Sequence, residues 1–251
     1  MPENLGIIIL AAGLGTRMKS DKAKVLHEIC GRPMINYVVD TACRLAGDNV
    51  FLVVGHQAEQ VRTVVGREHQ VRFALQPEQL GTGHAVLCAL PRLGDQIQDV
   101  VILCGDVPLI RPDTIAEIID THRNERNDVT LFVVAVDNPT GYGRVILDAG
   151  HQLTGIVEEA DATAAQKKIN IINTGIYVVT RHFLSAALPQ LRADNAQKEI
   201  YLTDIIAIGH RSQRRMGVVT GRDPDEIIGI NSPVELQRVE NMMKNRSLEK
   251  Y

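Results

Sequence analysis

Apolar runs without polar alternation organise the first half of the chain. All four are short and rich in β-branched residues: Ile7–Ala12, Val50–Val54, Val71–Leu75 and Val100–Cys104. A short run that is apolar at every position predicts a strand buried on both faces, as in a parallel sheet. Segments with helical periodicity separate the runs, at about Met34–Ala46, Ala58–Gly66 and Gly83–Leu90. The alternation predicts βαβ units in a layered, doubly wound α/β domain.

The pattern changes in the second half of the chain, where glycine and short β runs dominate. A helix is expected near Asp113–Arg123 and a strand at Val129–Val136. Further short β runs follow at Val145–Leu147, Leu153–Val157 and Ile176–Val179. We expect this half to form a smaller lobe over the open edge of the sheet, carrying a second substrate.

A capping box marks the start of the last element. Ser232-Pro233-Val234-Glu235 combines an N-cap serine with a glutamate three residues later, and proline stands at the first helical position. Apolar residues then recur at helical spacing. The sequence predicts a C-terminal helix over residues 232–251, with Asn231 immediately before its start.

Composition excludes several classes of partner. The formal net charge is −3 and aromatic residues make up 4% with no Trp, so nothing favours nucleic-acid binding. The four cysteines form no CxxC pair or zinc spacing, which is typical of reduced thiols in a cytoplasmic protein. The run Ile7–Ala12 is too short for a signal sequence or a membrane span. We therefore expect a cytoplasmic protein without a membrane partner, and its oligomeric state stays open.

The strongest local signal is a glycine loop with basic residues. A buried strand leads through Leu10, Ala11 and Ala12 into a turn bearing Gly13 and Gly15, where backbone N–H groups can approach an anion. Four basic residues follow: Arg17, Lys19, Lys22 and Lys24. A dinucleotide-binding loop would need glycine in place of Met18, and a P-loop motif is absent. A triphosphate cradle or a plain structural turn remains, and the basic cluster favours the cradle.

Further candidate residues lie in the segments after two other predicted strands, where ligands of such folds bind. Asp106 is a hard oxygen ligand that suits Mg²⁺, although an Asp in a turn before Pro108 would also cap that turn. Gln76 ends another strand, and its amide can pair with the edge of a pyrimidine. Gly81 and Thr82 open the next helix, whose N-terminal amides are donors for an anion. His84 is expected to be a structural hydrogen-bonding residue.

A series of motifs resembles one enzyme family in order along nearly the whole chain. The motifs are LAAGLGTRMKSDKAKVLHEICGRPMI, LQPEQLGTGHA, GDVPL, PTGYGRV, GIVEEADAT, INTGIY, YLTDI and GIN. Together they resemble the sugar-phosphate nucleotidyltransferases. The best match is to the uridylyltransferase domain of the bacterial bifunctional N-acetylglucosamine-1-phosphate uridylyltransferase/glucosamine-1-phosphate acetyltransferases.

The resemblance implies a Rossmann-like, mostly parallel mixed sheet flanked by helices, with a smaller sugar-binding lobe. It implies a nucleotidyltransferase domain over residues 1–231, with a nucleotide-binding part at about 1–110 and a sugar-binding part at about 111–231. The implied reaction joins UTP to N-acetylglucosamine 1-phosphate with Mg²⁺, forming the cell-wall precursor UDP-N-acetylglucosamine and pyrophosphate.

The resemblance also assigns roles to single residues. Arg17 is expected to bind the outgoing pyrophosphate and Lys24 the α-phosphate, whereas Lys19 and Lys22 are left in solvent. Asp106 and Asn231 are the expected metal ligands. The remaining expected substrate-binding residues are Leu10, Ala11, Ala12, Gly13, Gly15, Gln76, Gly81, Thr82, Cys104, Gly105, Gly143, Glu158, Asn173 and Asn231.

Two departures from the family pattern limit what the resemblance implies. Cys104 stands where the family has a tyrosine, which puts one sugar-side contact in question. The hexapeptide repeats of an acetyltransferase domain are absent, so acetyl transfer is not expected and the chain is either truncated or a natural single-function enzyme. Two alternatives stay open: transfer to another base or sugar, such as dTTP with glucose 1-phosphate, and a nucleotide-sugar-binding protein without turnover. A Rossmann dehydrogenase is a distant third.

Overall fold

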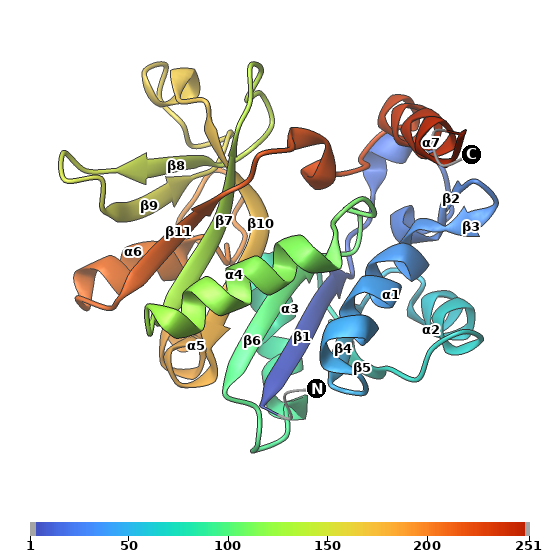
Figure 1. Ribbon diagram of the computed structural model, residues 1–251, viewed down its shortest axis with the longest axis horizontal. Helices are drawn as coiled ribbons and strands as arrows, with labels where there is room; N and C mark the ends of the chain where they lie inside the picture. The colour runs from blue at the N-terminus through green and yellow to red at the C-terminus, as the bar shows by residue number, and fades with distance from the viewer. Residues whose placement is uncertain (1–3, 249–251) are drawn as a thin grey trace.

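One mixed sheet runs through the described part of the chain, residues 4–248 of the computed structural model (Figure 1). Its nine strands are β1 (Leu5–Ala11), β4 (Val50–Val54), β5 (Arg72–Leu75), β6 (Asp99–Cys104), β7 (Val129–Ala135), β8 (Arg144–Leu147), β9 (Leu153–Val157), β10 (Ile171–Thr180) and β11 (Met216–Thr220). The main order is β11-β7-β10-β6-β1-β4-β5, and β8 joins β10 to β9. A separate hairpin pairs β2 (Glu28–Ile29) with β3 (Arg32–Pro33).

The strands predicted from apolar runs form the parallel half of this sheet. β1 lies between β4 and β6, and β5 follows β4, all in parallel. Every residue of β4 and nearly every residue of β1 and β6 is buried, as expected for strands covered on both faces. The same expectation was wrong for β5, because it is the edge strand of the sheet: Arg72 and Leu75 are exposed and only Ala74 is buried. The prediction of a doubly wound α/β domain is confirmed.

The second half of the chain extends the same sheet. β10 pairs antiparallel with both β6 and β7, and β11 pairs parallel with β7. The β8–β9 pair branches from β10. The sheet is therefore mixed, and its antiparallel strand lies directly beside the parallel half.

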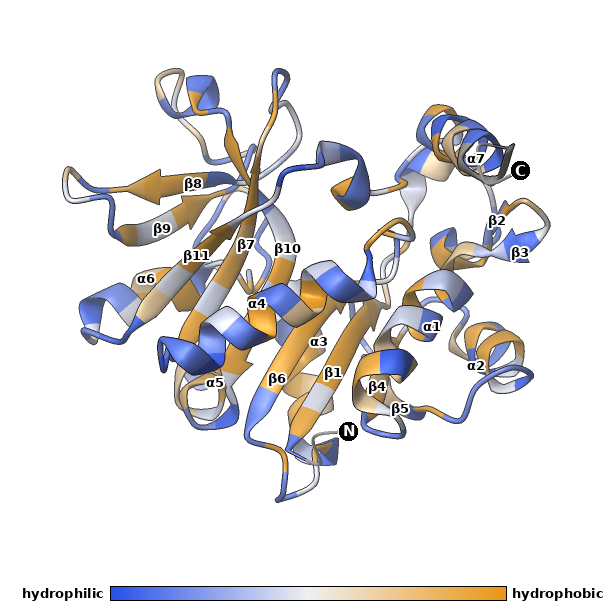
Figure 2. Ribbon diagram, viewed as in Figure 1, coloured by the Kyte–Doolittle hydropathy of each residue, from blue (hydrophilic) through white to orange (hydrophobic). Residues whose placement is uncertain are grey.

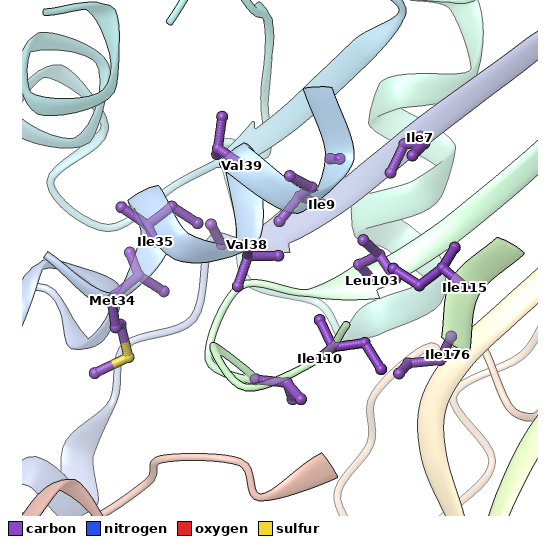
Figure 3. Packing of buried hydrophobic residues seen from close by; sticks show 14 of the residues in the cluster. Ile7, Ile9, Met34, Ile35, Val38, Val39, Leu103, Ile110, Ile115 and Ile176 are labelled. Atoms are coloured by element: carbon purple, nitrogen blue, oxygen red, sulfur yellow. The ribbon is translucent and has the colours of Figure 1, made fainter. Parts of the chain in front are cut away.

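Helices cover both faces of the sheet. Those packed with the first core cluster are α1 (Met34–Ala46), α2 (Ala58–Gly66), α4 (Pro112–Asn124) and α7 (Pro233–Leu248). Those packed with the second are α3 (Thr82–Ala89), α5 (Arg181–Ala187) and α6 (Asp204–Arg211). Figure 2 shows the apolar strands between these layers, and Figure 3 shows α1 residues packed over β1. Short 3-10 turns are η1 (Thr16–Met18), η2 (Lys24–Leu26), η3 (Leu90–Arg92), η4 (Gln166–Lys168), η5 (Leu188–Gln190) and η6 (Pro224–Ile227).

The capping box at the start of α7 forms as predicted. The backbone N–H of Glu235 donates to Ser232 Oγ at 3.3 Å, and the Glu235 carboxylate accepts from the Ser232 hydroxyl at 2.9 Å and from the backbone N–H of Asn231, one residue before the cap, at 2.8 Å. The predicted continuation of this helix to Tyr251 lies outside the described residues. Among residues 4–248, no helix combines the length and the apolar character needed to cross a bilayer.

Candidate functional site

The loops after β1 and β6 leave the sheet side by side. From β1 the chain builds β4 and β5 on one side and then returns to add β6 on the other, which makes β1 and β6 the switch point of the topology. Leu10 lies in register with Cys104, and the Gly105 amide donates to the Leu10 carbonyl at 2.9 Å. Ligands of open α/β sheets bind at such a point, beyond the carboxyl ends of the strands.

Two cationic and two oxygen-bearing side chains meet at this point. Lys24 Nζ lies 2.5 Å from Asp106 Oδ2 and 3.0 Å from Asn231 Oδ1. Arg17 donates to the same Asn231 oxygen at 2.9 Å. Lys24 and Asp106 are only 16% exposed, so their attraction is weakly screened. Residues from the glycine loop, the β6–α4 loop and the approach to α7 thus converge, although 207 positions separate Lys24 from Asn231.

In the glycine loop, the backbone of Gly15 packs directly against the side chain of Lys24. Gly15 has a φ of +65°, and a Cβ built on it would lie 2.5 Å from Lys24 Cβ. Any larger residue would therefore be strained and would also push against the lysine. The buried side chain of Met18 in η1 anchors the same loop to the core.

The oxygens of Asp106 and Asn231 fit a magnesium site. Both contact one cationic atom, Lys24 Nζ, so they face a common point. A carboxylate and an amide oxygen are hard ligands, and Mg²⁺ takes one or two such protein ligands beside phosphates and water. Within residues 4–248 no group of three or more His, Cys, Asp or Glu is placed to hold a metal.

A cavity of about 410 Å³ opens on one side of this cluster, and we call it the larger cavity. Of the expected residues it is lined by Leu10, Ala11, Ala12, Gly13, Gly15, Lys24, Gln76, Gly81, Thr82, Cys104 and Asp106. It is also lined by residues that the sequence reasoning missed: Leu14, Thr16, Val25, Gln79, Ala85 and Glu199.

Neighbouring groups orient the Gln76 amide in the larger cavity. Gln76 is 3% exposed, and its Nε2 donates to the Gly81 carbonyl at 3.0 Å and lies 3.2 Å from His84 Nδ1. A carbonyl oxygen only accepts, so the amide nitrogen must face Gly81. The structural role expected for His84 is confirmed by its contacts with Gln76 and the Glu78 carbonyl. The Gly83 amide, by contrast, donates to the Ile200 carbonyl and is not a donor for a ligand.

A second cavity of about 260 Å³, the smaller cavity, opens on the other side of the cluster. It is lined by Gly143, Glu158 and Asn173 from the second half of the chain, together with Arg17, Asp106 and Asn231. A Cβ on Gly143 would lie 3.0 Å from Ile156 Cγ2 and 3.2 Å from Glu158 Oε2, so a larger residue would crowd this corner. Tyr142 and Thr203 also line it and were not expected.

Polar groups in the smaller cavity have defined roles. Asn173 Oδ1 accepts from the Gly175 amide and from the Tyr177 hydroxyl, each at 3.0 Å, so its amide N–H groups are what it offers a ligand. Burial raises the pKa of Glu158, and nearby Asp204 raises it further, whereas the Thr203 hydroxyl lowers it. A carboxylate beside amide donors is a suitable set for recognising sugar hydroxyls.

Cys104 lines both cavities at the end of β6. Its Sγ lies 3.8 Å from the Gly175 carbonyl. Burial raises the pKa of the thiol to about 12, with a further contribution from Asp106. The side chain is therefore a neutral, apolar wall and not a nucleophile.

Nearly all of the expected residues come together at the two cavities. Gly105 is the exception: it lies behind the lining, where a Cβ would meet Ile35 Cδ1 at 2.9 Å. Lys22 pairs with Glu28 on the surface, in line with its expected place in solvent. Among the missed residues, Gln79 and Glu199 are polar residues in loops, with no local signal that separates them from ordinary surface positions.

Comparisons with known proteins identify the family of this chain. Residues 7–202 match the model of the MobA-like NTP transferase domain. A bifunctional protein GlmU from Syntrophotalea carbinolica is 46% identical over 97% of this chain and 52% of its own length. GlmU proteins from Desulfotalea psychrophila and Caldanaerobacter subterraneus are 44% and 46% identical, covering 71% and 54% of their own lengths. The chain thus spans about half the length of most of these curated relatives.

A solved structure shares the fold. It is assigned to a glucose-1-phosphate thymidylyltransferase from Bacillus anthracis in complex with a sucrose. The two chains superpose with a TM-score of 0.72 at 19% identity, over 95% of this chain and 94% of the other. The likeness confirms the predicted nucleotide-diphospho-sugar transferase type of fold.

Proposed function

Because the chain belongs, with the GlmU proteins, to the MobA-like NTP transferase family, we propose that it transfers a uridylyl group from UTP to N-acetylglucosamine 1-phosphate. The products are pyrophosphate and UDP-N-acetylglucosamine, a precursor of the cell wall. The observation that carries the proposal is the cluster of Arg17, Lys24, Asp106 and Asn231 between two cavities at the switch point.

The two cavities divide the substrates between two parts of the chain. The larger cavity, lined mostly by residues before position 110, takes the nucleotide. The smaller cavity, to which residues after position 110 contribute Gly143, Glu158 and Asn173, takes the sugar phosphate. In this proposal residues 1–231 form the nucleotidyltransferase domain, with its nucleotide part at about 1–110, its sugar part at about 111–231, and the C-terminal helix following.

The reaction is an attack of a sugar-phosphate oxygen on the α-phosphorus of UTP. Both partners are anionic, so the protein must chiefly neutralise charge and hold the groups in line. Lys24, in the larger cavity, binds the α-phosphate. Arg17 lines the smaller cavity and contacts Asn231, and in this proposal it leaves Asn231 to bind the departing pyrophosphate. Asp106 and Asn231 would hold Mg²⁺, which supplies further positive charge to the phosphates when it is bound. A phosphate monoester is already nucleophilic, so no covalent intermediate on the protein is required.

Gln76 gives a physical reason for choosing uracil over cytosine. Its amide nitrogen is engaged by the Gly81 carbonyl, which leaves its oxygen to accept a hydrogen bond from the base. Uracil carries a donor at N3, and cytosine has an acceptor at the same position. Thymine shares the N3 donor, so this contact alone does not separate UTP from dTTP.

We place the reaction in the cytoplasm. All four cysteines are free, as expected for a protein in a reducing compartment. The substrates proposed here are small molecules, and the net charge of −3 gives no support to a nucleic-acid partner.

A pyrophosphate-release assay tests the function. UTP, dTTP and CTP are each combined with N-acetylglucosamine 1-phosphate or glucose 1-phosphate, with and without Mg²⁺. We expect release only with UTP, a sugar phosphate and Mg²⁺ together, fastest with N-acetylglucosamine 1-phosphate. Activity mainly with dTTP and glucose 1-phosphate would move the specificity within the same reaction class. No release with any combination would overturn the enzymatic proposal.

A further inference from the structure

Two segments of the chain supply the oxygens of the magnesium site, and they are joined where those oxygens lie. The β6–α4 loop, residues 105–111, carries Asp106, and residues 221–231 carry Asn231. The Ile230 amide donates to the Asp106 carbonyl at 2.9 Å. This backbone contact joins the two segments at the site itself.

A buried carboxylate joins the same two segments at a second place. Glu226, in η6, is only 3% exposed. Its Oε2 accepts from the Thr114 hydroxyl at 2.6 Å, and its Oε1 pairs with the Arg111 guanidinium. Arg111 is the last residue of the β6–α4 loop, and Thr114 lies in the first turn of α4. A carboxylate next to a helix N-terminus is also favoured by the helix dipole.

The two contacts close a ring around the metal ligands. From Asp106 the ring follows the loop to Arg111, crosses to Glu226 and returns along five residues to Asn231. Ile227, Ile228 and Ile230 of the returning segment are buried in the core cluster, so the segment cannot shift without disturbing its packing. Glu226 takes no part in lining either cavity.

We propose that Glu226 is a positioning residue that fixes the separation of Asp106 and Asn231 and thereby the affinity for the divalent cation. The inference rests on the metal-binding role given to these two residues in the proposed function. A buried carboxylate is costly to keep unless it is paired and hydrogen-bonded. A residue that served only to hold η6 to α4 would affect stability and leave metal affinity unchanged, and this difference provides the test.

The test measures the binding of Mn²⁺, a paramagnetic substitute for Mg²⁺, to the whole chain in the absence of nucleotide. Binding is followed by the loss of the EPR signal of the free ion. Glu226→Ala and Thr114→Val are compared with the wild type, with Asp106→Asn as the reference for loss of a ligand. Asp225→Asn is the matched control, because Asp225 is the neighbour of Glu226 and pairs with Arg238 on the surface. Mutating a residue that orients a metal ligand typically weakens metal binding by about 10–100-fold.

We expect the dissociation constant for Mn²⁺ to rise about tenfold in Glu226→Ala, at the lower end of that range, because the effect passes through the backbone. Thr114→Val should cause a smaller rise, and Asp225→Asn none. If Glu226→Ala fails to fold, Thr114→Val and Arg111→Ala carry the comparison. Where pyrophosphate release is measurable, the Mg²⁺ concentration for half-maximal rate should rise in parallel, with the rate at saturating Mg²⁺ nearly unchanged.

Lower melting temperatures with unchanged Mn²⁺ affinity in these variants would overturn the proposal and leave Glu226 a purely structural contact. An Mn²⁺ affinity that is insensitive to Asp106→Asn would also overturn it, because the metal site itself would be wrong. Weaker Mn²⁺ binding in a chain that releases no pyrophosphate would support the positioning role while the proposed reaction fails.

Discussion

Replacing Lys24 by alanine removes the ammonium group that connects Asp106 to Asn231. Lys24 Nζ lies 2.5 Å from the carboxylate oxygen and 3.0 Å from the amide oxygen. The substitution leaves Asp106 without its counter-charge in a site where both side chains are 16% exposed. Stability, metal binding and turnover should therefore all respond to this one change.

The expected loss of stability follows from the geometry. Unit charges at the observed 2.5 Å attract by roughly 7 kcal/mol at an effective dielectric constant of about 20, before desolvation is subtracted. Removing one partner of a buried pair typically costs about 3–5 kcal/mol, and partial exposure favours the lower end. A loss of about 3 kcal/mol corresponds to a melting temperature lower by about 6–12 °C in a chain of this size.

Mg²⁺ should stabilise Lys24→Ala more than it stabilises the wild type. In the wild type the ammonium group competes with a cation for the oxygens of Asp106 and Asn231, whereas the variant offers both oxygens. A tenfold tighter site would add about 1.4 kcal/mol of stabilisation at high Mg²⁺, or roughly 3–6 °C. The kcat should fall by about 10²–10³, by more than KM rises, because the charge is needed most in the transition state.

The assay is thermal denaturation with and without Mg²⁺, together with pyrophosphate release. Lys22→Ala is the matched control, because its ion pair with Glu28 is on the surface and is worth about 0–1 kcal/mol. The arrangement described for the site would be refuted if Lys24→Ala had the same melting temperature as the wild type. It would also be refuted if Mg²⁺ raised the melting temperatures of the two proteins equally. Equal losses in binding and turnover would show that the role of Lys24 in the transition state is wrong.

Three further predictions concern single residues of the two cavities. Asp106→Ala should abolish pyrophosphate release while circular dichroism stays native; turnover at saturating Mg²⁺ would show that another group holds the metal. Cys104→Tyr should sharpen discrimination between sugar 1-phosphates in kcat/KM, because Cys104 lines the smaller cavity, and an unchanged ratio would dismiss that role. Burial raises the pKa of Glu158, so its contribution to stability is present below its ordinary pKa and is lost as pH rises through the raised value. The melting temperature of Glu158→Gln relative to that of the wild type should therefore rise as the pH is raised from 4 to 8. A difference in melting temperature that stays constant with pH would contradict the raised pKa.

The sequence predicted the parallel half of the fold best. Its central strands β1, β4 and β6 are apolar at nearly every position, because both of their faces are covered, and such runs are visible without any tertiary information. Elements missed include β11, α5, α6 and the β2–β3 hairpin. The hairpin strands have two residues each, and its turn relies on positive φ at Cys30 and Gly31, which leaves little pattern to detect.

Strand direction was harder to predict than strand existence. The segment Ile176–Val179 was expected as a short β run, but β10 extends from Ile171 to Thr180 and is antiparallel to both neighbours. An irregularity between Asn173 and Tyr177 interrupts its pairing with β7, and Asn173 lines the smaller cavity at one end of it. Local patterns carry no information on direction or on such irregularities.

The sequence could predict the site residues for two reasons. Some of them follow strands that end at the same edge of the sheet, and the others match a family motif. The residues that support them escaped prediction. Glu226 stands in Asp223-Pro224-Asp225-Glu226, an acidic stretch that resembles a solvated turn, and only the fold shows that this carboxylate is buried against Arg111 and Thr114. Burial of a polar group depends on what the rest of the chain places over it.

The pairing of Leu10 with Cys104 has a consequence for how the protein moves. These neighbours in a continuous sheet line both cavities, so the two proposed substrates would bind against the same pair of strands. The cavities cannot separate without breaking the central strand pairing. We therefore expect that substrates order the surrounding loops and side chains, and that no hinge rotation between two halves is needed to bring attacker and target into line.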